Sequence, residues 1–221
     1  MMLSKKAQAS RKHILIVGLP RSGTSILASL IGAHPHISIC NEDFGKSWIN
    51  IIGKPIVGNK LCVPRQIDWK RRRTSWIKLL NRFGIFKLWP KSHFSLQDYL
   101  SLPNLIIIGI RRNPKKVRQS IQNRDSITWK GMGKGTSEKS ITKKTTQYTV
   151  DNGTEILDRL DKLDKSYFIQ FEELISDTEN ILKGIFHFID VEYKKGIVEQ
   201  ATKWNWVYPN VSKKGIDKSK V

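Results

Sequence analysis

Short apolar runs alternate with amphipathic segments over much of the chain. Apolar runs bounded by glycine, proline or charge are typical of buried strands, and they occur at 13–17, 37–40, 105–110 and 166–171. Apolar residues recur at helical spacing, or follow a helix-start signal, at 23–33, 114–123, 149–163 and 178–189. Strands that alternate with helices predict an α/β fold, with three α/β/α layers and a central parallel sheet.

Two stretches lack a clear period. Residues 43–99 carry scattered Trp, Gly and Pro, and we expect an irregular or helical insertion there. Residues 124–146 are polar and rich in Gly and Lys, which predicts a mobile loop. The predicted organisation is a basic N-terminal tail, one domain and a basic C-terminal tail, at 1–12, 13–204 and 205–221.

The charge balance indicates anionic partners. The chain has 39 Lys and Arg against 19 Asp and Glu, a formal net charge of +20. Nucleic acid, an anionic membrane surface, an acidic glycan and a phosphorylated nucleotide all remain compatible with it. No apolar run reaches the roughly 20 residues of a membrane span. With two cysteines and a polar start, we expect a reduced, cytoplasmic compartment.

A glycine-rich loop follows the first predicted strand and opens the first predicted helix. Its sequence, Gly18 to Ser25, is Gly-Leu-Pro-Arg-Ser-Gly-Thr-Ser. Free N–H groups at a helix start bind anions. The glycines have Walker A spacing, but Thr24 stands where the Walker lysine would be, and Arg21 lies inside the loop. This predicts a phosphate site that needs no metal; the alternative is an ordinary glycine turn.

A second basic constellation follows the strand at 105–110. Arg112 stands at the strand end, Ser120 lies eight positions on, and Arg124 lies one helical turn further. Ser120 and Arg124 therefore share a helix face, and with Arg112 they could surround one terminal phosphate. The alternative is a helix that begins with surface charge.

These two motifs resemble those of sulfotransferases that use 3'-phosphoadenosine 5'-phosphosulfate (PAPS). The run from Pro20 to Glu42, with Ala33-His34-Pro35 inside it, is most similar to tyrosylprotein sulfotransferases and related bacterial and Golgi-type enzymes. The resemblance implies a P-loop-like fold and PAPS as co-substrate, with no metal required. It implies that the 5'-phosphosulfate is held by Arg21, Ser22, Gly23, Thr24 and Ser25, and the 3'-phosphate by Arg112, Ser120 and Arg124.

The resemblance also implies the catalytic groups. Glu42 aligns with the family's glutamate base, Lys91 with a lysine that assists the leaving group, and Arg21 contributes to catalysis as well as binding. His93 replaces a proline often found after that lysine. Phe44 replaces an arginine of the tyrosylprotein enzymes, which argues against a tyrosyl-peptide acceptor. The acceptor is then expected to be a hydroxyl or amine, on a saccharide, a lipid-linked glycan or another alcohol, with residues 43–90 shaping its site.

Two alternatives remain at this stage. A P-loop kinase would normally carry the Walker lysine, and an Mg²⁺-binding aspartate where the 105–110 strand ends in Arg-Arg. A basic protein that binds nucleic acid through its charge would lose affinity steeply as salt rises and would not respond to PAPS. The sequence does not indicate specific nucleic-acid binding, a metal site or an oligomeric state.

Overall fold

A single parallel sheet forms the centre of the molecule. The computed structural model describes residues 11–45, 47–69, 94–130 and 143–203. The strands of this sheet are β1 (Lys12–Gly18), β2 (Ile37–Asn41), β3 (Ile56–Cys62), β4 (Leu105–Arg111) and β5 (Ser166–Gln170). Their order is β2-β3-β1-β4-β5, and every neighbouring pair is parallel.

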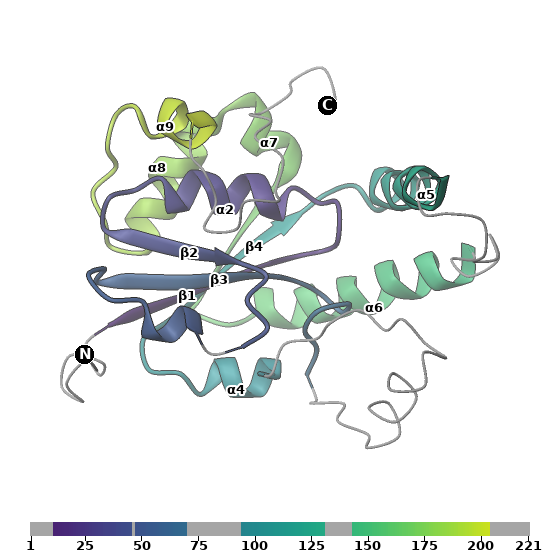
Figure 1. The fold of residues 1–221 in the computed structure, drawn as a ribbon, viewed down its shortest axis with the longest axis horizontal. Helices are drawn as coiled ribbons and strands as arrows, with labels where there is room; N and C mark the ends of the chain where they lie inside the picture. The colour runs from purple at the N-terminus through teal and green to yellow at the C-terminus, as the bar shows by residue number, and fades with distance from the viewer. Residues whose placement is uncertain (1–10, 46, 70–93, 131–142, 204–221) are drawn as a thin grey trace.

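Helices cover both faces of the sheet (Figure 1). One face carries α2 (Thr24–Gly32), α7 (Phe171–Ser176), α8 (Thr178–Phe188) and α9 (Ile197–Lys203). The other carries the 3-10 helix η1 (Ser47–Asn50), α4 (Leu96–Leu100) and α6 (Lys143–Asp161). The helix α5 (Pro114–Lys130) extends past the carboxyl ends of the strands, beside the start of α6. This is the predicted three-layer α/β/α arrangement.

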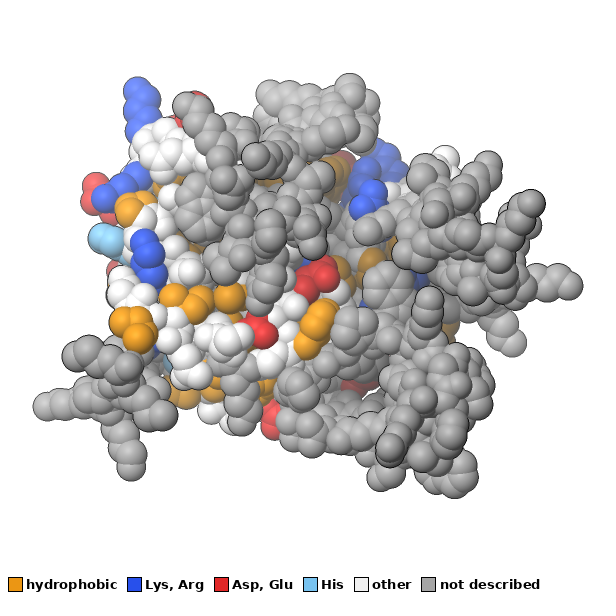
Figure 2. All heavy atoms as spheres, in the orientation of Figure 1, with side chains coloured by type: hydrophobic (Ala, Val, Ile, Leu, Met, Phe, Trp, Pro, Cys, Tyr) orange, Lys and Arg blue, Asp and Glu red, His pale blue; other side chains and the backbone are white. Residues whose placement is uncertain are grey.

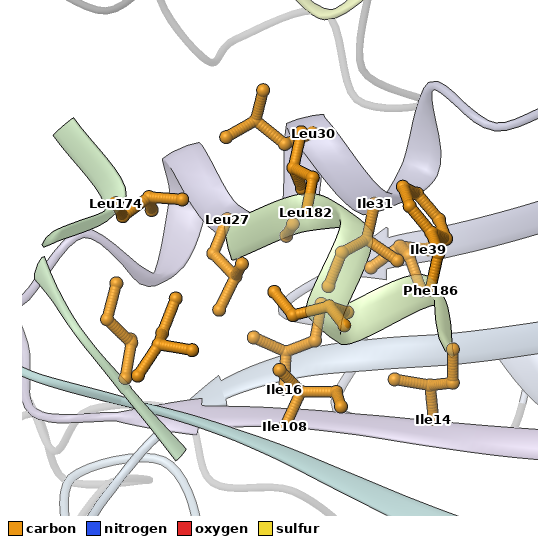
Figure 3. Packing of buried hydrophobic residues seen from close by; sticks show 14 of the residues in the cluster. Ile14, Ile16, Leu27, Leu30, Ile31, Ile39, Ile108, Leu174, Leu182 and Phe186 are labelled. Atoms are coloured by element: carbon orange, nitrogen blue, oxygen red, sulfur yellow. The ribbon is translucent and has the colours of Figure 1, made fainter. Parts of the chain in front are cut away.

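The core has one cluster on each face of the sheet, because the central strands are buried on both sides. On the α2 face, Ile14, Ile16 and Ile108 pack against Leu27 of α2, and α8 completes the layer (Figure 3). On the opposite face, alternate residues of the same strands pack against η1, α4 and α6. The β-branched residues of these strands suit such a two-sided environment.

Two predictions for the irregular stretches were wrong in the parts that the structure describes, and residues 70–93 of the first stretch lie outside those parts. Within 43–99, residues 56–62 form β3, which lies between β1 and β2 and is buried along its whole length. Within 124–146, α5 continues to Lys130 and α6 begins at Lys143, while residues 131–142 of the predicted loop lie outside the described residues. The sequence pattern missed β3 because Gly58, Asn59 and Lys60 interrupt its apolar run.

Figure 2 shows basic side chains at both ends of the face in view, including the end where α5 lies in Figure 1. Lys115 and Lys116 in the first turn of α5 are exposed there. Among the described residues, no helix is both long and apolar enough to cross a membrane.

Candidate functional site

The loop between β1 and α2 is shaped by two residues with positive φ. Arg21 has φ 70° and Gly23 has φ 93°, and both are left-handed conformations. The backbone N–H and the hydroxyl of Ser22 both donate to the carbonyl of Leu19, at 3.1 and 2.7 Å. Ser22 is fully buried, so its hydroxyl closes the loop instead of pointing outward. The loop is therefore a compact turn that leaves the side chain of Arg21 exposed.

Close packing explains the glycines of this loop. A Cβ at Gly18 would lie 2.6 Å from the hydroxyl oxygen of Ser22, and a Cβ at Gly23 would lie 2.4 Å from the ring of Phe171. Gly23 is also the N-cap of α2, and no side chain caps that helix in the described structure. The first N–H groups of α2 are then donors for an anion at the carboxyl end of β1.

The loop and the second basic constellation meet in space. The guanidinium of Arg112 donates to the carbonyl of Arg21 at 3.0 Å, and Nε of Arg21 donates to the hydroxyl of Ser120 at 3.2 Å. Arg112 also stacks on Phe171, 4.4 Å from the ring centroid. Its Nε is buried and has no hydrogen-bond partner in the described part of the chain. The structure thus joins the two motifs into one site.

Two predicted residues cannot be placed in this site by their side chains. Arg124 lies on α5, one turn after Ser120, as the spacing predicts, but its side chain is outside the described residues. Lys91 lies entirely outside them. Ser25 is in the first turn of α2 and is half-buried. Both Arg124 and Lys91 stay predictions.

Glu42 lies directly after β2, near the carboxyl end of β3, and forms an ion pair that the sequence did not predict. Its Oε1 accepts a hydrogen bond from Nζ of Lys60 at 2.6 Å, and its backbone N–H donates to the Lys60 carbonyl at 3.0 Å. The Lys60 side chain is 2% exposed, whereas that of Glu42 is 38% exposed. A lysine buried this deeply requires a charged partner. The signal that could have revealed it is the short polar interruption Asn59-Lys60 between two apolar pairs, Ile56-Val57 and Leu61-Cys62.

Lys60 lies on the same face of the sheet as α2. Side chains alternate between the two faces along a strand, so residues an even number of positions apart share a face. Ile56, four residues before Lys60, belongs to the cluster that packs against α2. Cys62 lies two residues after Lys60, and its Sγ is 3.7 Å from the hydroxyl oxygen of Thr24 at the start of α2. The Glu42–Lys60 pair and the glycine-rich loop are therefore at the carboxyl edge of neighbouring strands, where ligands bind in sheets of this kind.

The remaining polar chemistry near the site is limited. Cys40 and Cys62 are free and buried, and burial raises the pKa of Cys40 to about 11, so this thiol stays protonated. In the described ranges, no group of three His, Cys, Asp or Glu side chains has an arrangement that could hold a metal ion.

Comparison with known proteins agrees with this fold. The sulfotransferase domain family model matches residues 11–219. A solved sulfotransferase domain from the curacin biosynthetic pathway is similar in fold, with a TM-score of 0.53, 13% identity, and coverage of 96% of this chain and 83% of that one. A mouse sulfotransferase, solved in complex with the 3',5'-bisphosphate PAP, gives a TM-score of 0.51 and 16% identity, and the match covers 90% of this chain and 68% of that one. No curated protein gives a significant match in sequence.

A parallel sheet with a phosphate-type loop at its carboxyl edge defines a protein of the P-loop-like α/β class. Within that class, the chain belongs to the sulfotransferase family. It is therefore an enzyme of sulfuryl transfer, and the family uses PAPS as the donor. Of the three functions compatible with the sequence, family membership favours this one over a kinase or a nucleic-acid-binding protein.

Proposed function

We propose that this chain transfers the sulfuryl group of PAPS to a hydroxyl or amine acceptor, with Glu42 as the general base. The observation that carries the proposal is the contact between the two anion motifs, through Arg21, Arg112 and Ser120. PAPS has phosphate groups on both the 3' and the 5' side of its ribose, whereas ATP lacks the 3'-phosphate. A site built from two joined anion motifs fits PAPS better.

The proposed roles follow from position. Residues 21–25 and the N-terminus of α2 bind the 5'-phosphosulfate, while Arg112 and Ser120, with Arg124, bind the 3'-phosphate. The acceptor oxygen or nitrogen forms a bond to sulfur as the bond from sulfur to the phosphate oxygen breaks. Glu42 takes the acceptor proton, and the product 3',5'-bisphosphate (PAP) leaves with the negative charge.

Lys60 gives the leaving group a cation. It is held against Glu42 at the edge of the sheet where the loop lies, and it is desolvated, which strengthens its interaction with developing negative charge. Lys91 remains a second candidate for this role. A comparison of Lys60→Met with Lys91→Met separates the two candidates. Only the substitution that removes the lysine in contact with the leaving group should lower the turnover number strongly.

Calorimetry with PAP tests the binding site. We expect PAP to bind without Mg²⁺ and in the presence of EDTA, and Arg112→Gln to weaken binding by roughly 10- to 100-fold, the cost of about 1.5–3 kcal/mol for a lost charge-assisted hydrogen bond. Lys115→Gln is the matched control, since it removes one exposed positive charge from the neighbouring helix turn. Binding of ATP with Mg²⁺ but not of PAP would refute the proposal.

Turnover tests the base. Glu42→Gln keeps the size and a hydrogen-bonding oxygen of the side chain but cannot accept the proton. We expect unchanged PAP affinity and a loss of roughly 100- to 10,000-fold in sulfuryl transfer from labelled PAPS. A Glu42→Gln enzyme with normal turnover would remove Glu42 from the mechanism.

The acceptor is proposed from charge. The net charge of +20 and the exposed Lys115 and Lys116 at the start of α5 favour an anionic or saccharide acceptor. Labelled PAPS incubated with anionic glycans, neutral glycans and simple alcohols should label the anionic glycans fastest at low salt. A preference for neutral alcohols at every ionic strength would exclude this acceptor class.

A further inference from the structure

The residue after Glu42 is held by a buried polar network. Asp43 is 6% exposed, and its carboxylate accepts three hydrogen bonds, from the N–H groups of Gly45 and Trp48 and from the hydroxyl of Ser47, at 2.8, 2.8 and 2.6 Å. The carboxylate therefore folds the chain after β2 into a tight turn around itself. A buried carboxylate with three donors is fixed in orientation.

The side chain of Asn59 clamps the backbone of the same residue. Its Oδ1 accepts from the N–H of Asp43 at 3.1 Å, and its Nδ2 donates to the carbonyl of Asp43 at 2.7 Å. The Nδ2 group also donates to the hydroxyl of Tyr99 on α4 at 3.0 Å. Asn59 is fully buried, so each of these polar groups depends on its partner.

Asn59 and Lys60 are consecutive in β3 and face opposite sides of the sheet. Lys60 lies on the α2 side, whereas Asn59 lies on the side of Tyr99 and α4. Correspondingly, Glu42 bonds to Lys60 and Asp43 bonds to Asn59. Two neighbouring residues after β2 are thus each held by one residue of β3, from the two faces.

Glu42 needs this support because its backbone is in an unfavourable conformation. Its φ is 63°, a left-handed value that costs a residue with a side chain roughly 1–2 kcal/mol. Such a conformation persists only where the surrounding contacts over-determine it. The two bonds from Asn59 to the next peptide units supply that constraint.

We propose that Asn59, acting through Asp43, is a positioning residue that holds Glu42 in its left-handed conformation and its carboxylate on the α2 side of the sheet. The inference rests on the proposed function, in which Glu42 is the base. Asn59 bonds to Asp43 and Tyr99 on the face of the sheet opposite α2, and through Asp43 it sets where the Glu42 carboxylate lies. A base displaced by about 1 Å loses rate by up to roughly 100-fold.

The substitution Asn59→Asp tests this role. It keeps the acceptor for the N–H of Asp43 but replaces the amide donor with an oxygen that repels the Asp43 carbonyl. We expect the turnover number to fall roughly 10- to 100-fold while the KM for PAPS and the calorimetric affinity for PAP stay unchanged. Hydrogen exchange of the amides in residues 41–48 should become faster, because the N–H groups of Asp43, Gly45 and Trp48 are bonded within this network.

Tyr99→Phe is the matched control. It removes the third bond of the Asn59 amide, keeps both bonds to Asp43, and keeps the stacking of the Tyr99 ring on Trp48. We expect nearly wild-type turnover and exchange. If Asn59→Asp does not fold, Asn59→Ser carries the test with the same readouts, since its shorter side chain loses the amide donor to the Asp43 carbonyl and introduces no charge.

The outcomes separate the inference from the proposed function. Wild-type turnover in Asn59→Asp, beside an inactive Glu42→Gln, overturns the positioning role alone. Wild-type turnover in Glu42→Gln overturns the base and the positioning role together. Equal losses of PAP affinity and turnover in Asn59→Asp also overturn the role, because they indicate general damage to the fold.

Discussion

Gly23→Ala perturbs the glycine-rich loop at its tightest point. The residue has φ 93°, and a Cβ there would lie 2.4 and 2.7 Å from two carbons of the Phe171 ring. Real Cβ contacts do not come this close, and Phe171 is itself buried, with 6% of its surface exposed. The new methyl group therefore forces both the loop and the ring to move.

The cost of this substitution has two parts. The left-handed conformation costs a residue with a Cβ roughly 1–2 kcal/mol, and overpacking of a buried ring costs roughly 1–3 kcal/mol. We expect the free energy of unfolding to fall by about 2–5 kcal/mol. Affinity for PAP should fall as well, because the shifted residue is the N-cap of α2 and its displacement misaligns the first N–H groups of that helix.

Gly53→Ala is the matched control for the backbone part. Gly53 has φ 82°, and a Cβ there would meet no atom within 4 Å. Denaturant unfolding of the two variants gives the steric part as their difference. The double variant Gly23→Ala/Phe171→Leu should recover much of that part, with a coupling energy of roughly 1–3 kcal/mol. Equal destabilisation of Gly23→Ala and Gly53→Ala, with unchanged PAP affinity, would refute the reasoning.

Two further predictions concern buried charge and protonation. Lys60→Met should lower the turnover number roughly 100- to 1000-fold. Its free energy of unfolding, measured by denaturant, should be equal to that of the wild type or greater, because the substitution removes a desolvated ammonium and the partly exposed Glu42 stays hydrated. A destabilised variant with normal turnover would contradict this prediction. Burial lowers the pKa of His34, which is 1% exposed and whose ring bonds to the carbonyl of Glu192, and it lowers that of His13 in the same way. The unfolded state therefore binds more protons, and the free energy of unfolding should decrease as the pH falls below about 6.5, the ordinary value. His34→Gln should flatten that decrease and substitution of the exposed His36 should not, in a series of unfolding curves against pH.

The sequence predicted the elements whose signal is local. Residues 13–17 and 105–110 are predominantly apolar runs, and both form central strands as expected. The strand β3 escaped prediction because Asn59 and Lys60 are polar and buried, each satisfied by a residue 16 or 18 positions earlier in the chain. No local pattern contains those partners, so only the folded sheet reveals why these residues are tolerated.

The candidate site was predictable to a similar degree. The loop at 18–25 and the Arg112–Ser120 spacing pointed to two anion sites, and the structure brings these motifs into contact. The environment of Glu42 was not predictable, because its partner Lys60 comes from a strand that the pattern missed. The buried hydrogen bond from the Ser22 hydroxyl to the Leu19 carbonyl was also not predictable, since sequence alone does not show which way a loop hydroxyl points.

The Glu42–Lys60 ion pair has a consequence for the order of charge movements during a reaction cycle. In the resting protein the buried ammonium is neutralised by the carboxylate 2.6 Å away. When Glu42 accepts a proton in the proposed mechanism, that neutralisation ends at the moment the leaving phosphate gains negative charge. Lys60 then exchanges one counter-ion for another without leaving its buried position, and the cycle can restart only after Glu42 has returned its proton to solvent and the bisphosphate has departed.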